Sequence, residues 1–457
     1  MTGGAGGRLP VSPARAAAFK MLMRIESADA YASELLHSRA LAKLPPADLG
    51  LLTELVMGVL RWRGVLDERI AEHASQPPAK LDLEVLTALR LGAYQLLFLD
   101  RVPVHAAVNE SVELTKRARK RSAAGIVNAV LRRLAAARVR GLSPQEDAGS
   151  LPASAGLAHP PWLVERWREN YGLPRAHGIS AYHQVAPKTA IRVEAPAVLD
   201  ELEQEGIRLK PGSLLRKAFV IEAGDITRTE AFRERRLFIQ DEASQLVALL
   251  VGRGGSILDC CAAPGGKTRI LAEQNPGSTL IALELYPRRA LLLKRLVRAG
   301  HVRVIAADAR QIPLEKKFDR VLVDAPCSGT GTLARNPEIK WRLKAEDIRR
   351  LESYQLQLFE SAMEIAAPGG RLVYSTCSLE PEENQAVVER ALTANGSFRV
   401  LDCRRELERL KLEGELATGD LDSLLSGPYL RTLPGVHSCD GFFAAILEKP
   451  ALTPSPA

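Results

Sequence analysis

The chain has 457 residues, 46% of them hydrophobic, which is ordinary for a globular protein and enough for roughly two to four domains. A mean hydropathy of -0.06 and the lack of any apolar run approaching ~18 residues exclude an integral membrane protein. The first residues, MTGGAGGRLP, lack the charged and then apolar layout of a signal peptide, so we expect a cytoplasmic protein.

The net charge of +8 lies entirely within residues 1–140, which hold 21 basic and 13 acidic residues. Its densest point is KRARKR at 116–121. Such a cluster would attract a polyanion by neutralising phosphates, although a solvated helix face is the alternative. Six cysteines with no CxxC pair and no Cys/His cluster argue against disulfides and structural zinc, so we expect no metal site.

Residues 12–140 are predicted to be helical. Apolar residues recur there at spacings of three and four, and prolines fall between the periodic segments, where a missing N–H does no harm. No alternation typical of strands occurs in this region. We therefore expect an all-helical, basic bundle over residues 1–140.

A short polar segment separates this bundle from a second region. Residues 141–161, GLSPQEDAGSLPASAGLAHPP, are rich in Gly, Pro, Ser and Ala and are predicted to form a linker. The following sequence begins with an amphipathic helix, WLVERWRENYG, and continues with TAIRVEA, IRLK and AFVIEA, which have the composition of short strands. We therefore expect a small α+β subdomain over residues 162–236.

Residues 237–457 alternate between predicted helices and strands. Strands joined by helical crossovers predict a parallel, doubly wound sheet. Ligands of such sheets bind beyond the carboxyl ends of the strands. The residues found at those ends are Asp259, Glu284, Asp308, Asp324 and Cys377.

The loop after the first of these strands, LDCCAAPGGKT at 258–268, contains a glycine pair that lets the backbone approach a ligand closely. A P-loop would need glycine where Cys261 stands, and GxGxxG is absent, so pyrophosphate is not the expected ligand. Glu284 follows Asp259 by 25 residues, close to the ~20 at which a strand-end carboxylate accepts ribose hydroxyls. This pattern suits a nucleoside such as S-adenosylmethionine, although Glu284 and Asp308 could equally cap helices or turns.

Two later loops, DAPCSGTGTLARNPEIKW at 324–341 and YSTCSLEPEEN at 374–384, each place a cysteine at the same edge of the sheet. A single cysteine is more often a small hydrophobic core residue than a nucleophile. Two cysteines at adjacent strand ends favour a catalytic role. Because the thiolate is the reactive form, a nucleophilic cysteine needs nearby positive potential or helix N-termini, which loops at this edge can supply.

The motifs CAAPGGKT, DAPCSGTG and STCSLEPEEN resemble those of the RNA cytosine-C5 methyltransferases and occur in that family's order. HAAVNESVELTK and GIVNAVLRRL in the helical region resemble the NusB-type RNA-binding domain. The combination is similar to the RsmB/Sun/Fmu family of bacterial 16S rRNA methyltransferases and covers nearly the whole chain. It implies an all-α NusB-like N-terminal bundle, a small α+β subdomain and, over residues 237–457, an α/β Rossmann-like methyltransferase domain.

The resemblance also implies which residues form the site. S-adenosylmethionine would be held by the loop residues Cys261, Ala262, Ala263, Pro264, Gly265, Gly266 and Lys267. Glu284 would hold the ribose, Asp308 would lie by the adenine, and Asp324 would lie between cofactor and cytosine. Cys377 takes the family's nucleophile position, and Cys327 that of the cysteine that helps to release product.

These residue types suit methylation at cytosine C5, a carbon too weakly nucleophilic to react unaided. Addition of the Cys377 thiolate at C6 would make an enamine with electron density at C5. Asp324 would stabilise the adduct at the N3 and N4 edge of the base, and Cys327 would assist expulsion of the sulfur. The target base must be unpaired or flipped out.

RNA contacts are expected from the basic helical region and from RRALLLKRLVR at 288–298. Arg335, Lys340, Trp341 and Arg342 are expected to clamp the substrate near the cysteines, unless Trp341 is a core residue. By family analogy the target is cytosine 967, the partner is 16S rRNA or an assembling small ribosomal subunit, and we expect a monomer.

Two alternatives remain open at this point. One is a 5-methylcytosine methyltransferase acting on 23S rRNA or tRNA, which would share the same core motifs. The other is a non-catalytic NusB-like RNA-binding or assembly factor, which the presence of both cysteines and all four strand-end carboxylates disfavours.

Overall fold

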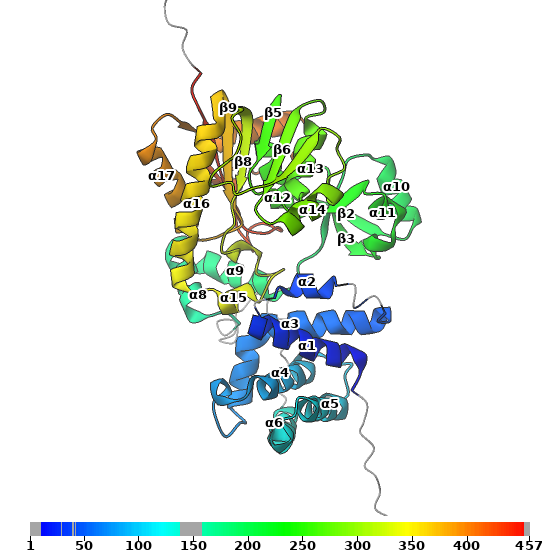
Figure 1. Cartoon of the computed structure of the whole chain (residues 1–457). Helices are drawn as coiled ribbons and strands as arrows, with labels where there is room; N and C mark the ends of the chain where they lie inside the picture. The colour runs from blue at the N-terminus through cyan, green and yellow to red at the C-terminus, as the bar shows by residue number, and fades with distance from the viewer. Residues whose placement is uncertain (1–10, 29, 39–40, 42, 138–157, 452–457) are drawn as a thin grey trace, which may run out of the picture. The chain divides into compact units, whose positions relative to one another are not determined.

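The computed structural model describes residues 11–28, 30–38, 41, 43–137 and 158–451 (Figure 1). Most of the predicted linker, residues 141–157, lies outside this described part. The chain divides into two compact units, Met1–Ala186 with Leu333–Arg342 and Pro187–Thr332 with Leu343–Ala457. In the described part of the chain, no helix is both long and apolar enough to cross a membrane.

The first unit is built from helices whose apolar residues repeat every three to four positions and pack into one core. On α3, for example, Leu52, Leu55, Val56 and Val59 are all buried. This confirms the predicted helical bundle. The helices are α1 (Pro13–Ala28), α2 (Ala32–Leu36), α3 (Pro46–Ala71), α4 (Leu83–Phe98), α5 (Val104–Arg117), α6 (Ala124–Ala136), α8 (Pro161–Tyr171) and α9 (Leu173–Gln184).

A segment from much later in the sequence, Leu333–Arg342, completes the first unit and contains α15 (Ile339–Arg342). Lys340 Nζ donates a 2.9 Å hydrogen bond to the Arg61 carbonyl, and Trp341 Nε1 donates a 2.6 Å bond to the Leu60 carbonyl. The expectation that Lys340 clamps the substrate is therefore wrong, because its side chain is fully buried. Trp341 is a packing residue, which was the alternative given for it from the sequence.

Arg342 and Glu338 are engaged in the same unit. Arg342 donates to the carbonyls of Ile25 and Ala30 at 2.7 and 2.6 Å, and Glu338 accepts the N–H of Ala32 at 2.9 Å. Lys340 and Arg342 thus satisfy backbone carbonyls elsewhere in the helical unit, a structural role that sequence patterning does not distinguish from phosphate binding.

The second unit begins with a small antiparallel sheet in the order β2-β3-β1-β4. Its core includes Ile191, Leu202 and Leu237. The segments TAIRVEA, IRLK and AFVIEA contain its first three strands, as expected. The elements are β1 (Ala190–Val193), α10 (Ala197–Gln204), β2 (Arg208–Pro211), β3 (Ala218–Ala223), α11 (Glu230–Arg233) and β4 (Leu237–Ile239).

The boundary between the two units, after Ala186, falls inside the subdomain that the sequence predicted over residues 162–236. Helices α8 and α9 belong to the first unit, and the sheet belongs to the second. The fully buried rings of Trp167 and His183 lie 5.5 Å apart between these two helices, and α9 contacts α3. Tertiary contacts therefore group the helices with the bundle rather than with the strands that follow them.

The larger sheet of the second unit has the order β11-β12-β13-β9-β8-β5-β6-β7 within the described residues, and β10 pairs with β13. Strands β7, β6, β5, β8 and β9 are parallel. The prediction of an α/β domain is confirmed, but the sheet is mixed, because β13 returns antiparallel to β9 and carries β10 and β12.

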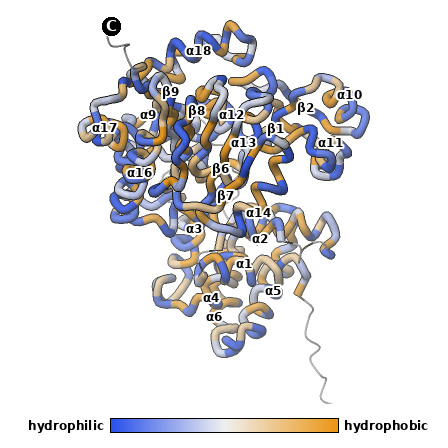
Figure 2. Tube along the Cα trace, turned by 45° about the horizontal axis from the view of Figure 1, so that its top comes forward, coloured by the Kyte–Doolittle hydropathy of each residue, from blue (hydrophilic) through white to orange (hydrophobic). Residues whose placement is uncertain are grey.

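Helices cover both faces of this sheet (Figure 1). Leu322 of β8 packs in the core cluster that includes α12, whereas its neighbours Val321 and Val323 pack in the cluster that includes α16. This alternation explains why the strands are apolar on both faces, as the hydrophobic colouring of the central strands in Figure 2 illustrates.

The elements of this domain, in chain order, are α12 (Glu242–Leu250), β5 (Ser256–Asp259), α13 (Gly266–Gln274), β6 (Thr279–Glu284), α14 (Pro287–Leu296), β7 (Val302–Ala306), β8 (Phe318–Asp324), α16 (Ala345–Ile365), β9 (Ala366–Thr376), α17 (Gln385–Ala394), β10 (Arg399–Leu401), α18 (Cys403–Leu412), β11 (Leu425–Ser426), β12 (Tyr429–Thr432) and β13 (Phe442–Glu448).

Candidate active site

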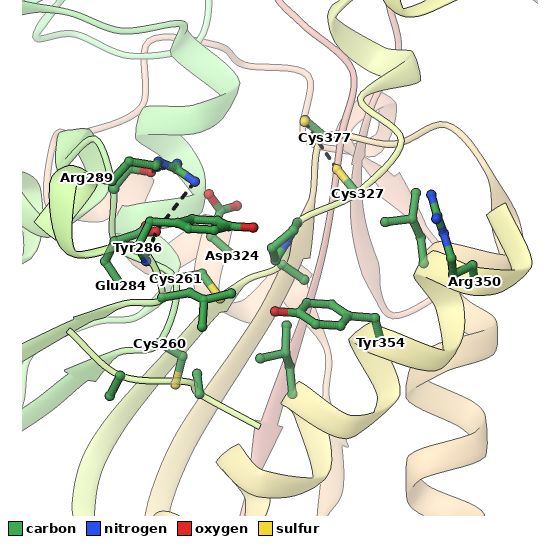
Figure 3. Close-up of a pocket in the computed structure, with 18 residues that line it drawn as sticks. Cys260, Cys261, Glu284, Tyr286, Arg289, Asp324, Cys327, Arg350, Tyr354 and Cys377 are labelled. Carbon is green, nitrogen blue, oxygen red and sulfur yellow. Dashed lines mark hydrogen bonds and ion pairs between the residues drawn. The ribbon is translucent and has the colours of Figure 1, made fainter. Parts of the chain in front are cut away.

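A cavity of about 510 Å³ opens at the carboxyl ends of the parallel strands of the second unit (Figure 3). Its lining combines side chains from the loop after β5, the end of β6, the end of β8, the end of β9 and one face of α16. They include Cys261, Ala263, Glu284, Tyr286, Arg289, Asp324, Cys327, Arg350, Tyr354 and Cys377.

The loop after β5 needs glycine at its turn. Gly265 has φ +116°, and a Cβ there would lie 2.7 Å from Leu293 and 2.8 Å from Val297. The loop is tied to β6, because the Ala262 N–H donates a 2.9 Å hydrogen bond to the Leu283 carbonyl. Of the seven loop residues expected to hold the cofactor, Cys261 and Ala263 line the cavity.

Asp259, at the end of β5, lies beneath this loop with 1% exposure. Thr268 Oγ1 donates to Asp259 Oδ2 at 2.7 Å. Burial, with a smaller contribution from the nearby Asp324 charge, raises the pKa of Asp259 to about 7. Through this hydrogen bond with Thr268, Asp259 holds the loop in place from the protein interior.

The two later strand-end carboxylates differ in position. Glu284 is buried, lines the cavity, and accepts the Tyr286 N–H at 3.0 Å, while Arg289 lies 3.6 Å from it. Asp308 accepts the Arg310 N–H at 2.9 Å and pairs with the Arg310 side chain at 2.6 Å, which lowers the pKa of that carboxyl. Its neighbours Ala307 and Ala309 line the cavity instead.

Asp324 has each carboxylate oxygen engaged by a different partner. Lys267 Nζ donates to Oδ2 at 2.6 Å, and Ser375 Oγ donates to Oδ1 at 2.8 Å. Lys267 also lies 5.0 Å from the Phe442 ring centroid. The cofactor-loop lysine thus orients a carboxylate 57 residues away in the sequence.

The two motif cysteines meet at the mouth of the cavity. Their Sγ atoms lie 3.3 Å apart, and both side chains are half-buried (Figure 3). The hydrogen bond with Cys377 raises the pKa of Cys327 well above its usual value, and burial acts in the same direction. Gly331 permits this approach, because a Cβ there would lie 2.1 Å from the Gly441 oxygen.

The lining also includes Tyr286, Arg289, Arg350 and Tyr354, none of which was assigned to the cofactor or the catalytic site from the sequence. Tyr286 and Arg289 follow Glu284 closely, so their place after a strand end could have drawn attention to them. Arg350 and Tyr354 lie on α16, and their helical spacing is also that of an ordinary surface face. Only the packing of α16 against β8 and β9 brings them to the cavity.

The cavity fits an adenosine-type cofactor. A buried carboxylate that can accept hydroxyl hydrogen bonds lies beside the exposed ring of Tyr286, and Tyr354 approaches the cavity from α16 (Figure 3). Among the described residues, no group of three or more His, Cys, Asp or Glu side chains could hold a metal ion.

Comparison with known proteins agrees with this geometry. A family model described as 16S rRNA methyltransferase RsmB/F matches residues 247–448, one described as NusB family matches residues 12–136, and one described as a ferredoxin-like domain of RsmF/B-like methyltransferases matches residues 159–227. The probable ribosomal RNA small subunit methyltransferase B of Bacillus subtilis is 34% identical over 94% of this chain and 98% of its own.

The chain belongs to the RsmB/F family of 16S rRNA methyltransferases. Ribosomal RNA small subunit methyltransferase B of Vibrio cholerae is 33% identical over 89% of this chain and 91% of its own. The crystal structure of PH0851 covers 97% of this chain and all of its own with a TM-score of 0.78 and 25% identity. As an RsmB/F methyltransferase, the protein uses S-adenosylmethionine as its methyl donor.

Proposed function

We propose that this protein methylates C5 of a cytosine in 16S rRNA, cytosine 967 in the usual rRNA numbering, through a transient bond between Cys377 and C6. The observation that carries this proposal is the 3.3 Å pairing of Cys327 and Cys377 at a cavity that Asp324 and Glu284 also line. Addition of a thiolate at C6 turns the unreactive C5 into an enamine carbon.

The arrangement supports Cys377 as the nucleophile. Cys327 and Cys377 share a 3.3 Å hydrogen bond in which either sulfur can donate. The pKa of Cys327 is raised, which favours its keeping the proton and donating to an attacking sulfur at position 377. Together with the place of Cys377 in the Ser-Thr-Cys motif, this supports Cys377 rather than the Pro-Cys residue Cys327 as the nucleophile.

Asp324 is the carboxylate available to the base. Lys267 and Ser375 hold it in one orientation, so it can meet the N3 and N4 edge of a cytosine without reorganising. Glu284 would hold the ribose of S-adenosylmethionine, with the loop from Cys261 to Lys267 around it. When bound, this cofactor supplies an electrophilic methyl group that the activated C5 takes.

Release of the product regenerates the nucleophile. After methylation the C5 proton is lost to a base, the electron pair re-forms the C5–C6 double bond, and the bond between Cys377 and C6 breaks. Cys327, 3.3 Å from the departing sulfur, is placed to stabilise the leaving Cys377 thiolate by a hydrogen bond while the C5 proton passes to water, which acts as the base.

The RNA backbone is expected to contact α14 and the residues around it. Residues 285–303 contain six Arg or Lys and no Asp or Glu. Arg288, Lys294 and Arg295 are exposed, beside the exposed apolar side chains of Leu291 and Leu292. Because Tyr286 and Arg289 also line the cavity, this basic face leads directly to the reacting base.

The helical unit offers a second basic surface. Arg117, Arg119 and Arg121 are exposed, whereas Lys116 and Lys120 are paired with Glu113 and Asp82 at 2.7 and 2.8 Å. Neutralising phosphates with such exposed guanidinium groups gives affinity without sequence preference. The proposed partner is 16S rRNA, free or within an assembling small subunit.

The test uses a 16S transcript that contains 5-fluorocytosine, which cannot lose a C5 proton. Wild-type protein with S-adenosylmethionine should form a covalent complex, and mass spectrometry should locate the link at Cys377. Bisulfite mapping of rRNA from cells without the protein should show loss of methylation at cytosine 967 only. A missing modification in 23S rRNA or tRNA would reassign the substrate, and no crosslink at all would refute the covalent mechanism.

A further inference from the structure

Glu383 is a fully buried carboxyl group that the mechanism above does not use. It ends the short helix η6 (Pro381–Glu383) and has 0% exposure. Burial raises the pKa of this carboxyl group. A buried carboxyl group requires hydrogen-bond donors around it, so its partners indicate what it holds in place.

One set of donors comes from the loop of Cys327. The N–H of Ser328, the residue after Cys327, donates to Glu383 Oε1 at 2.8 Å. The Ser328 hydroxyl donates to Glu383 Oε2. Both hydrogen-bond donors of the residue next to Cys327 are therefore bound by one carboxyl group.

Another donor comes from the loop of Cys377. The hydroxyl of Ser378, the residue after Cys377, donates to the same Oε2 atom at 2.5 Å. The two serine hydroxyls also lie 3.0 Å from each other. Glu383 Oε2 is thus a shared acceptor for the residues that follow the two cysteines, which are 50 positions apart in the sequence.

Glu383 is itself held by α16 through its carboxyl group and by β9 through its backbone carbonyl. Gln355 Nε2 donates to Glu383 Oε1 and to the Pro326 carbonyl, each at 2.9 Å. The Tyr374 hydroxyl donates to the Glu383 carbonyl at 2.6 Å. A residue anchored on two elements, with its carboxyl group bound to two loops, fixes the loops relative to each other, because hydrogen bonds constrain direction as well as distance.

From these contacts we infer that Glu383 is a positioning residue that holds the Cys327 and Cys377 loops in register and so sets the separation of their sulfur atoms. This role rests on the proposed function for its catalytic consequence. Attack at C6 and expulsion of the same sulfur require both thiols at one base. A displacement of either loop by about 1 Å would slow both steps by as much as about 10²-fold.

Removal of the Glu383 carboxyl group leaves other ties between the loops. The Gly331 N–H donates to the Cys377 carbonyl at 2.9 Å, and the Leu379 N–H donates to Thr330 Oγ1 at 2.8 Å. Variants at position 383 should therefore keep the fold and lose the fine placement of the sulfurs.

The test compares Glu383→Ala and Glu383→Gln with Glu389→Gln, a change of an exposed glutamate on α17. Glu383→Ala should lower kcat by about 10²-fold with KM for RNA and affinity for S-adenosylhomocysteine within about threefold of wild type. Glu383→Gln should recover much of kcat, because its amide oxygen can accept from the Ser328 N–H and Gln355, and the serine hydroxyls can rotate to accept from its NH2 group. Glu389→Gln should match wild type.

A second readout needs no RNA. Diamide oxidises two adjacent thiols to a disulfide and is itself reduced to the hydrazine, so the rate of Cys327–Cys377 linkage, followed by mass spectrometry, measures how close the sulfurs are held. Glu383→Ala should slow this linkage by on the order of tenfold. This measurement tests the role of Glu383 even if wild-type protein methylates no 16S transcript, in which case only the proposed function fails.

Three results would overturn the inference. The first is a Glu383→Ala protein with wild-type kcat and linkage rate. The second is Glu383→Gln falling as low as Glu383→Ala in both readouts. The third applies if Glu383→Ala does not fold. The double variant Ser328→Ala, Ser378→Ala keeps the carboxyl group but loses both hydroxyl donors. A wild-type kcat and linkage rate for this double variant would show that the shared acceptor positions nothing.

Discussion

The Sγ atoms of Cys327 and Cys377 lie 3.3 Å apart although they come from different strand ends, those of β8 and β9. These strands are adjacent and parallel, with Asp324 opposite Ser375 in the register. The loops that follow them therefore emerge side by side at the same edge of the sheet. This adjacency places the two thiols within reach of one base, as the proposed mechanism requires.

The two cysteines should fail differently when replaced. Cys377→Ala should abolish both methylation and covalent capture of RNA, because no other thiol takes its place. The Cys327→Ala variant should still form the bond between Cys377 and C6 but release product slowly. A covalent RNA complex should therefore accumulate during turnover with unmodified RNA. Denaturing gel electrophoresis of the reaction with labelled 16S transcript measures both effects. Accumulation in the Cys377 variant instead would exchange the two roles.

Lys267 should be needed to orient Asp324. Lys267→Met removes the 2.6 Å contact with Asp324 Oδ2 and leaves a half-buried carboxylate that still accepts a hydrogen bond from Ser375. We expect single-turnover methylation to fall by about tenfold to 10²-fold. Lys267→Arg, which keeps the charge, should retain more activity than Lys267→Met. Equal rates for wild type and Lys267→Met would mean that Asp324 is held well enough without the lysine.

Asp259 should make stability depend on pH. Its pKa is about 7 in the folded protein and about 4 in an unfolded chain. Between these values the folded state keeps a proton that the unfolded state has lost, so this group's contribution decreases as pH rises from about 4 to 7, by up to about 4 kcal/mol. The contribution of Asp259 to the free energy of unfolding is complete below about pH 4 and is lost above about pH 7.

The matched variant for this effect is Asp259→Asn, whose amide oxygen can still accept from Thr268. The free energy of unfolding of Asp259→Asn minus that of wild type should be larger at pH 8 than at pH 5. Denaturant unfolding of both proteins at the two pH values measures the difference. The same wild-type-to-variant difference at both pH values would contradict the raised pKa of Asp259.

The basic face around α14 should contribute affinity for RNA without selectivity. Arg288→Gln and Arg295→Gln should each weaken binding to every transcript and lower the slope of log affinity against log salt by about 1. Lys340→Met is the matched control, because Lys340 is fully buried and should not change RNA affinity. Filter binding at several salt concentrations provides these slopes. An effect confined to one transcript would instead indicate base recognition.

Much of this architecture could be predicted from local patterns. Apolar periodicity identified the helices of the first unit, and alternating helices and strands identified the α/β domain. The strand-end rule identified Glu284, Asp324 and Cys377, which all line one cavity. These inferences succeed because the side-chain period of an element and the chain direction of a parallel strand are local properties.

Other features depended on which elements pack together. The sequence suggests that Lys340 is a solvent-facing cation, but Leu333–Arg342 joins the helical unit and its amine is buried against the Arg61 carbonyl. Asp308 and Glu284 look equivalent in the sequence, yet Arg310 pairs with Asp308 while Glu284 lines the cavity. Charge and strand-end position alone do not distinguish these cases.

Local patterns were enough to predict the element types, the edge of the sheet at which the candidate site lies, and the cysteines and carboxylates present there. Three contacts became visible only in the folded chain: Lys267 meets Asp324, Tyr354 reaches the cavity from α16, and Glu383 joins the residues after both cysteines. The physical reason is that these contacts join residues far apart in the chain, and strand register and helix packing set such distances, whereas local periodicity does not.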